Sequence, residues 1–163
     1  MTTYRDTVTT RISGIRLLMP RVLSELLPCI NIDDFPNFCG AGDGIGEALV
    51  PDTFYGLSMR HCCFIHDITH TIYPPTKTFW HKSNELLLIN CLRTIRVKSG
   101  NRLTRFLRER RALTYFNAVE SGIGLRCFMR RRPDGPGVEG YDPVKDPEFK
   151  AKLLKVGVRC DTY

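Results

Sequence analysis

Hydrophobic and polar positions recur with helical spacing through most of the chain. Between residues 10 and 27 the apolar residues are Ile12, Ile15, Met19, Val22, Leu23 and Leu26. Arginines fall mostly on the other side, so the pattern predicts an amphipathic helix. Gly14 weakens that helix, and Pro20 kinks or restarts it because proline removes a backbone donor. Such a helix packs on the body of the domain or lies on a lipid surface, and both interpretations stay open.

Three more helices are predicted downstream. The first spans about 53–72 and is ended by two prolines, and the second spans about 78–98 and is stopped by Ser99 and Gly100. A third follows Asn101, which can cap it, and is closed by Gly122. The connection between the first two is short, so these two long helices should run antiparallel. No run of residues is convincing as a strand, and the predicted fold class is all-α.

The remaining segments are predicted as loops, with one short helix. Residues 31–51 and 130–145 are rich in Gly, Asp, Asn and Pro, which favour turns. Asp146 and Pro147 have the signature of a helix start, and that helix should extend through Leu154. With 163 residues the chain fits one domain. We divide it into an N-terminal amphipathic segment (1–36), a catalytic core (37–122) and a C-terminal extension (123–163).

Charge and composition narrow the classes of partner. A formal net charge of +7 favours acidic partners, either nucleic acid or anionic lipid headgroups, or serves solubility alone. No apolar run is long enough to span a bilayer. Seven cysteines favour an oxidising, extracellular compartment, but the odd count leaves at least one thiol unpaired. The N-terminus has no apolar core of a signal peptide, so an intracellular location stays open as well.

The stretch "HCCFIHD", residues 61–67, concentrates the candidate chemistry. Adjacent side chains on a helix diverge by about 100°, so Cys62 and Cys63 should reach different partners. Cys91 lies on the next predicted helix, and Cys39 lies in the glycine-rich loop. We expect disulfides Cys62–Cys91 and Cys39–Cys63. The second would fix loop carbonyl oxygens beside an acidic residue, which is how proteins build a Ca²⁺ site.

His66 and Asp67 take different roles in this arrangement. Asp67 can give carboxylate oxygens to an ion, while His66 faces the second helix. Histidine suits a general base near neutral pH, and it works best when a carboxylate orients its far nitrogen. The nearest candidate for that carboxylate is Glu85.

The motifs "NFCGAGDG" (37–44), "RHCCFIHD" (60–67) and "NELLLINCL" (84–92) resemble the secreted phospholipase A2 family, above all its shorter venom-type and microbial members. The resemblance implies a fold with two long antiparallel, disulfide-linked core helices and a glycine-rich Ca²⁺ loop. It also implies Ca²⁺-dependent hydrolysis of the sn-2 ester of glycerophospholipids at a membrane surface, which the net charge suggests is anionic. Outside residues 37–92 only a compatible helical character supports it.

The resemblance also implies roles for individual residues. The backbone carbonyls of Phe38, Gly40 and Gly42 and the carboxylate of Asp67 would hold Ca²⁺. His66 would remove a proton from the attacking water, with Glu85 orienting its ring. The Gly40 amide and the ion would stabilise the oxyanion.

The chain departs from the family pattern at three places. The family usually has aspartate where this chain has Glu85, and a shift of one residue would place Asn84 there instead. Thr69 and His70 stand where many members have cysteine and tyrosine, and the usual partner of that cysteine falls at Asn84, so both halves of one bridge are absent. Three further cysteines have no assigned partner: Cys29, Cys127 and Cys160.

Other interpretations remain open. A phospholipase-like binding or toxin module without turnover would keep the fold, since fold does not fix activity. A zinc site could use His61, Cys62, His66 and His70, although no second segment offers paired ligands. An arginine-rich third helix allows nucleic-acid binding, but we expect no nucleic-acid partner because that function leaves the cysteine pair unexplained. Five side chains are candidates for acyl-chain contact or for ordinary core packing: Leu17, Leu18, Phe35, Phe54 and Tyr55. The oligomeric state is left open.

Overall fold

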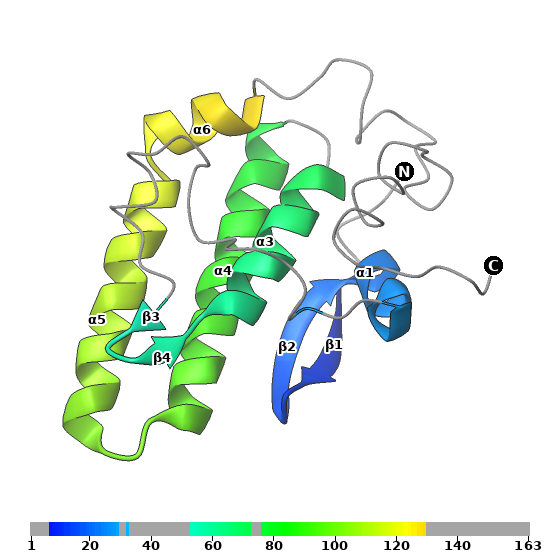
Figure 1. Ribbon diagram of the computed structural model, residues 1–163. Coiled ribbons are helices and arrows are strands. Elements are labelled where there is room, and N and C mark those ends of the chain that lie inside the picture. The colour runs from blue at the N-terminus through cyan, green and yellow to red at the C-terminus, as the bar shows by residue number, and fades with distance from the viewer. Residues whose placement is uncertain (1–6, 30–31, 33–52, 73–75, 130–163) are drawn as a thin grey trace.

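The computed structural model describes residues 7–29, 32, 53–72 and 76–129 of the chain (Figure 1). Its elements in chain order are β1 (Thr7–Ile12), β2 (Ile15–Pro20), α1 (Arg21–Leu26), the 3-10 turn η2 (Leu27–Cys29), β3 (Thr53–Phe54), β4 (Leu57–Ser58), α3 (Arg60–Ile72), α4 (Lys77–Lys98), α5 (Arg102–Val119) and α6 (Gly122–Met129). Two predictions lie outside these residues: the loop at 31–51, apart from Ile32, and the helix at 146–154. The predicted domain boundaries are not tested by the structure.

The first segment corrects the sequence prediction, because it is a β-hairpin and not one long helix. β1 pairs antiparallel with β2, with Ile12 opposite Ile15. Ser13 and Gly14 connect them with φ of 48° and 82°. Two consecutive residues with positive φ make the tight turn whose twist matches a hairpin. Only the end of the predicted helix is helical, as α1, which begins directly after Pro20.

Burial along β2 explains why the hairpin packs as it does. Ile15, Leu17 and Met19 are buried, while Arg16 is exposed, the alternation expected of a strand with one face on a core.

The hairpin is also fixed to α4 by a side-chain amide. Asn90 Oδ1 accepts a hydrogen bond from the Leu18 backbone N–H at 2.7 Å, and Asn90 Nδ2 donates to the Leu18 carbonyl at 2.7 Å.

A second, very short hairpin precedes α3 and shortens that helix relative to the prediction. β3 pairs antiparallel with β4 around Tyr55 and Gly56, whose φ values are 50° and 75°. The helix that was expected from residue 53 therefore begins at Arg60. The two hairpins together overturn the all-α fold class, although the described residues remain mostly helical.

The helices predicted at about 78–98 and after Asn101 are confirmed. α4 and α5 occupy the expected ranges, and each has a side-chain cap: Thr76 accepts from the Phe79 N–H, and Asn101 accepts from the Thr104 N–H. α6 was not predicted. α3 and α4 run antiparallel, since Cys62 near the start of α3 meets Thr94 late in α4, whereas His66 meets the earlier Asn84.

The predicted disulfide between these two helices is absent. Cys62 and Cys91 face each other but are both free thiols in the buried interface. Packing therefore holds α3 against α4. The expectation of a disulfide-linked phospholipase A2 core is wrong on this point too. Cys63 is disulfide-bonded, to a partner whose side chain is not among those described. The predicted partner Cys39 lies outside the described residues, so that pairing stays a prediction.

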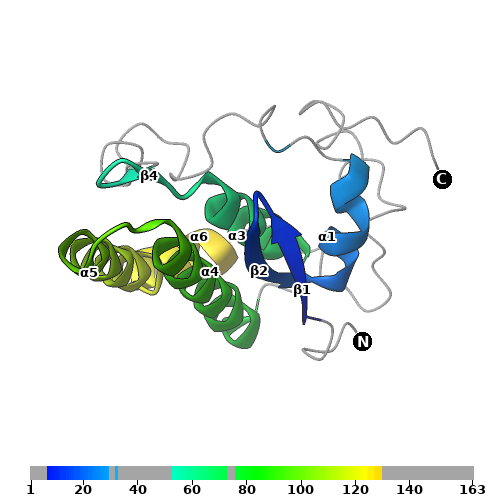
Figure 2. The same ribbon diagram turned by 90° about the horizontal axis from the view of Figure 1, so that it is seen from below.

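The described elements form successive layers, seen end-on in Figure 2: α5 at one edge, then α4 with α3, then the β1–β2 hairpin, and α1 at the other edge. One apolar core fills the space between the hairpin, α1 and α3, and includes Leu17, Met19, Leu23, Phe64 and Ile65. A second lies among α3, α4 and α5, and includes Met59, Cys62, Leu87, Ile95 and Ala112. None of the described helices is long and apolar enough to cross a bilayer.

Candidate active site around His66

His66 lies between α3 and α4 where three elements meet. α3 supplies His66 and its neighbour Asp67, and α4 supplies Asn84. The fourth residue, Glu120, follows directly after α5. The His66 ring is bonded on both sides: Nε2 lies 2.8 Å from Asn84 Oδ1, and Nδ1 lies 3.3 Å from Asp67 Oδ1. His66 is 6% exposed; its contact with Asn84 is buried, whereas its contact with Asp67 is partly open to solvent.

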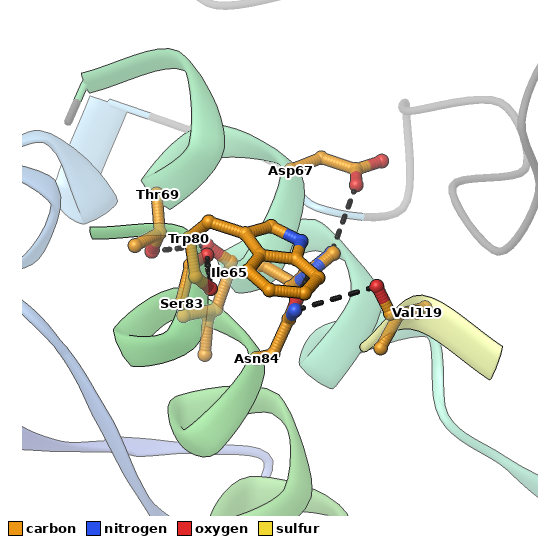
Figure 3. Close-up of polar contacts among 8 residues, drawn as sticks. Ile65, Asp67, Thr69, Trp80, Ser83, Asn84 and Val119 are labelled. Carbon is orange, nitrogen blue, oxygen red and sulfur yellow. Dashed lines mark hydrogen bonds and ion pairs between the residues drawn. The ribbon is translucent and has the colours of Figure 1, made fainter. Parts of the chain in front are cut away.

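The orientation of the Asn84 amide follows from its other contacts. Asn84 Nδ2 lies 2.9 Å from Glu120 Oε1 and 3.5 Å from the Val119 carbonyl oxygen. Both partners are acceptors, so the NH₂ group must face them and Oδ1 must face His66. Figure 3 shows Asn84 directed towards Val119 at the end of α5. Although amide ends are hard to tell apart by shape alone, the carboxylate of Glu120 decides the matter here.

The amide orientation in turn decides the tautomer of His66. Asn84 Oδ1 can only accept, so Nε2 of His66 carries the proton and donates it. In the neutral ring the lone pair is then on Nδ1, the nitrogen beside Asp67. A lone pair facing a carboxylate oxygen is unfavourable unless a proton, a water molecule or a cation lies with them. In this tautomer Nδ1 is the ring nitrogen that can accept a proton.

The polar chain continues past Glu120 to the surface. Glu120 Oε2 lies 2.7 Å from Nδ1 of His81, whose side chain is 46% exposed. At the other end the Asp67 side chain is 35% exposed. The five residues Asp67, His66, Asn84, Glu120 and His81 thus form one hydrogen-bonded chain, which we call the His66 network. It is accessible at both ends and buried in the middle.

The neighbouring hydroxyl groups do not join this network. Thr69 donates to the Ile65 carbonyl and Ser83 to the Trp80 carbonyl, each within its own helix (Figure 3). Thr69 and Asn84 are the two positions where the sequence predicted a missing family disulfide, and both are fully buried polar residues here. The indole Nε1 of Trp80 is buried and has no hydrogen-bond partner in the described structure.

Aromatic rings cover one side of His66. The ring centroid of His70 lies 3.9 Å from that of His66, and Phe128 of α6 lies 4.7 Å beyond His70. Phe128 thereby packs α6 against the ring of His70. His70, offered as a zinc ligand by the sequence, is packed here as part of this stack.

Glu85, the predicted orienting carboxylate, is not the residue that contacts His66. Its side chain is 56% exposed and pairs with Lys82 at 3.3 Å on the surface of α4. Asn84, the alternative that a shift of one residue would favour, occupies the position instead. A charge is still present one step further away, because Asn84 is itself bonded to Glu120.

The metal predictions are only partly covered by the structure. Asp67 is in place beside His66, while Phe38, Gly40 and Gly42, with the oxyanion role of Gly40, lie outside the described residues. Among residues that are described, no three of His, Cys, Asp or Glu are grouped to hold a metal ion. Of the four residues in the zinc set, His66 and His70 lie together. Cys62 faces Thr94 instead, and His61 Nε2 lies 3.3 Å from Ser13 Oγ of the hairpin turn.

Sequence reasoning missed Glu120 and His81. Glu120 lies 36 residues after Asn84, and no spacing rule connects a helix end with the middle of the previous helix. The only available signal was the high density of polar residues, Asn84 and Asn90, in the apolar stretch of α4. Buried side-chain amides require hydrogen-bond partners, so each one indicates a specific tertiary contact.

Comparison with protein-family models, curated proteins and solved structures finds no match to this chain. Functional inference therefore depends on the motifs and on the geometry of the His66 network.

Proposed function

We propose that the protein is a Ca²⁺-dependent hydrolase of the sn-2 ester of glycerophospholipids, with His66 as general base. The observation that carries the proposal is the His66 ring, whose Nε2 is held by Asn84 Oδ1 at 2.8 Å while Nδ1 faces Asp67. The ester and lipid class come from the resemblance of the motifs around residues 37–92. The geometry supports the base.

The His66 ring has the properties that proton abstraction requires. Nε2–H donates to Asn84, so the ring cannot turn without losing a buried hydrogen bond, and Nδ1 stays available to take a proton from water. When Nδ1 accepts that proton, the new N–H lies next to Asp67 Oδ1, which stabilises it as a hydrogen-bonded ion pair. Asn84 is neutral, but Glu120 polarises its amide and strengthens the bond to the imidazolium.

Asp67 fits the role of a calcium ligand. Ca²⁺ prefers oxygen donors and takes several carboxylate and carbonyl oxygens together. Asp67 would supply the carboxylate, and Phe38, Gly40 and Gly42 would supply backbone oxygens, as the resemblance implies. Bound Ca²⁺ would supply positive charge to stabilise the oxyanion of the ester.

The direct test is hydrolysis of vesicles of phosphatidylglycerol carrying a labelled sn-2 chain. We expect release of the sn-2 fatty acid that needs Ca²⁺ and stops with a chelator. His66→Gln should lower the rate by at least about 100-fold, the usual contribution of a general base. His61→Gln is the matched control, because His61 is on the same helix, bonds to Ser13 and stands outside the His66 network. Release from the sn-1 position, or a rate unaffected by His66→Gln, would contradict the proposal.

A second candidate keeps calcium and lipid binding but lacks turnover. The observation that favours it is that the partner of His66 is a neutral amide, which orients imidazole without itself stabilising the imidazolium charge. This candidate predicts Ca²⁺ binding by calorimetry that is weakened by Asp67→Asn, with no fatty acid released from any headgroup class. Detectable Ca²⁺-dependent release would eliminate it.

A further inference from the structure

The helix α5 packs on the protein along one side only. Ala112 is its one buried residue, and it contacts the core shared with α3 and α4. Arg108 also points inward, donating to the backbone carbonyls of Phe54 and Tyr55 at 3.1 and 2.9 Å. In Figure 2 α5 is the outermost layer, with α4 on its inner side and no described element beyond it.

The opposite side of α5 is apolar and exposed. Four large apolar side chains are 38–69% exposed: Leu103, Phe106, Leu107 and Leu113. Residues three and four apart share one face of a helix, and these four, with Arg110 among them, point away from Ala112. We call this set the outer face of α5. Soluble domains rarely leave a large contiguous apolar patch exposed to water, and such a patch marks an interaction surface.

The charges around the outer face are positive. α5 contains five arginines and one acidic residue, Glu109. Arg108 is used inside the fold, and Arg105 pairs with Glu109 at 3.0 Å. Arg102, Arg110 and Arg111 make no ion pair with the described part of the chain. Apolar side chains flanked by unpaired arginines are the composition of a helix that lies in the headgroup region of a membrane.

We propose that the outer face of α5 binds the surface of anionic phospholipid membranes. Charge complementarity selects this occupant. A second copy of the chain packed there would bring Arg110 and its neighbours against the same cations. A nucleic acid would match the arginines but leave four large apolar side chains exposed to phosphate and water. A lipid surface accepts both, since headgroups carry negative charge and the acyl boundary accepts Leu and Phe.

This inference goes beyond the proposed function, because the outer face would bind vesicles whether or not His66 hydrolyses them. If the enzymatic proposal is correct, α5 is the element that delivers the site to its substrate. Binding must therefore be measured without turnover. The His66→Gln protein with a calcium chelator serves as the parent for all variants, so that failure of lipid binding and failure of hydrolysis remain separate results.

The experiment is sedimentation with phosphatidylcholine vesicles that do or do not contain phosphatidylserine. Two matched pairs separate the outer face from general surface effects. Leu113→Ser is compared with Ile89→Ser, because these residues are 43% and 39% exposed on different helices. Arg110→Glu is compared with Arg96→Glu, an exposed arginine of α4 with the same change in net charge. Circular dichroism checks that each variant is folded.

We expect the parent to bind only vesicles with phosphatidylserine. Arg110→Glu should weaken binding by about tenfold or more and Leu113→Ser by about fivefold, with less than about twofold for either control. Equal losses in both members of a pair, or no binding to either vesicle, would overturn the proposal. So would retention on single- or double-stranded DNA that outcompetes the vesicles, or a concentration-dependent dimer that Leu113→Ser dissociates.

Discussion

The interface between α3 and α4 has two ends with opposite chemistry. At one end the buried polar groups of His66 and Asn84 belong to a hydrogen-bonded chain that reaches the surface at Asp67 and His81. At the other end, Cys62 is bonded to Thr94 at 3.4 Å and faces Cys91, and both cysteines are 1% exposed. Cys62 and His66 are only one helical turn apart.

The comparison shows that reactive residue types alone do not define a site. Both ends carry nucleophilic or basic groups in a packed interface. Only the histidine end has hydrogen bonds that connect it to exposed side chains, an oriented lone pair and a neighbouring carboxylate. The thiol end has partners that are all buried, so it contributes packing. We expect substitutions at the two ends to differ in size and in kind.

The largest difference should appear when each end loses its polar partner. Asn84→Leu leaves the N–H of His66 and the carboxylate of Glu120 without a buried partner, and should lower the free energy of unfolding by about 3 kcal/mol. Thr94→Val, the matched change at the thiol end, removes one weak bond and should cost about 1 kcal/mol or less. Urea unfolding measures both. Equal costs would contradict the distinction between the two ends.

A smaller effect should follow when a charge is added to the histidine end. Asn84→Asp places a carboxylate against Glu120, where the amide now lies at 2.9 Å, and should destabilise the protein by about 2 kcal/mol at neutral pH. Adding Glu120→Gln removes the repulsion and restores a donor. The double variant should therefore recover about 1–2 kcal/mol relative to the sum of the single changes. Strict additivity would show that residues 84 and 120 do not interact.

At the thiol end, stability should depend on alkaline pH. The pKa of the Cys91 thiol is raised well above its ordinary value of 9.0, chiefly by its hydrogen bond with Cys62 and secondly by burial. A raised pKa in the folded state means that the unfolded chain loses its proton first. The stability that Cys91 contributes is therefore fully present below pH 9.0 and is lost as pH rises from there towards its folded pKa, by at most about 1.4 kcal/mol per pH unit.

Cys91→Ser is the variant that tests this dependence. It should remove most of the alkaline slope in a series of unfolding measurements from pH 8 to 10 and leave hydrolysis at neutral pH close to normal. An unchanged slope would show that other groups cause the alkaline loss of stability.

The smallest expected effect is at the exposed end of the His66 network. His81→Gln removes one contact of Glu120, but Asn84 still donates to the other carboxylate oxygen. Because His81 is about half exposed, the loss should be below about 1 kcal/mol. The rate of hydrolysis should fall less than for any change at Asn84. A loss as large as that of Asn84→Leu would place the key contact at His81.

Part of this architecture can be predicted from the sequence, and the division has a physical basis. α4 and α5 follow from the regular spacing of apolar residues and, for α5, from Asn101 as a cap, which are local signals. The first hairpin was missed because apolar residues at alternate positions of β2 also fit a helical spacing of four. The turn residues Ser13 and Gly14 were the better signal. They adopt positive φ in the structure, which a helix does not use.

The candidate site divides in the same way. His66 and Asp67 could be named because they belong to one short motif on one helix. The choice between Asn84 and Glu85 depends on how α4 is rotated against α3, which packing decides and local sequence does not. Glu120 depends further on where α5 ends in space. The Cys62–Cys91 disulfide was expected because the two cysteines should lie close together. They do lie close together, but contact between two thiols does not by itself form a disulfide.

The central claim is that Asn84, held by Glu120, fixes His66 as the Nε2–H tautomer with its lone pair on Nδ1. Nitrogen-15 NMR of the histidine rings, at a pH where His66 is neutral, observes this state without any substrate. We predict a protonated Nε2 and an unprotonated Nδ1 for His66, with the preference lost in Glu120→Ala. A His66 ring protonated on Nδ1, or a mixture of tautomers that Glu120→Ala does not alter, would contradict the account.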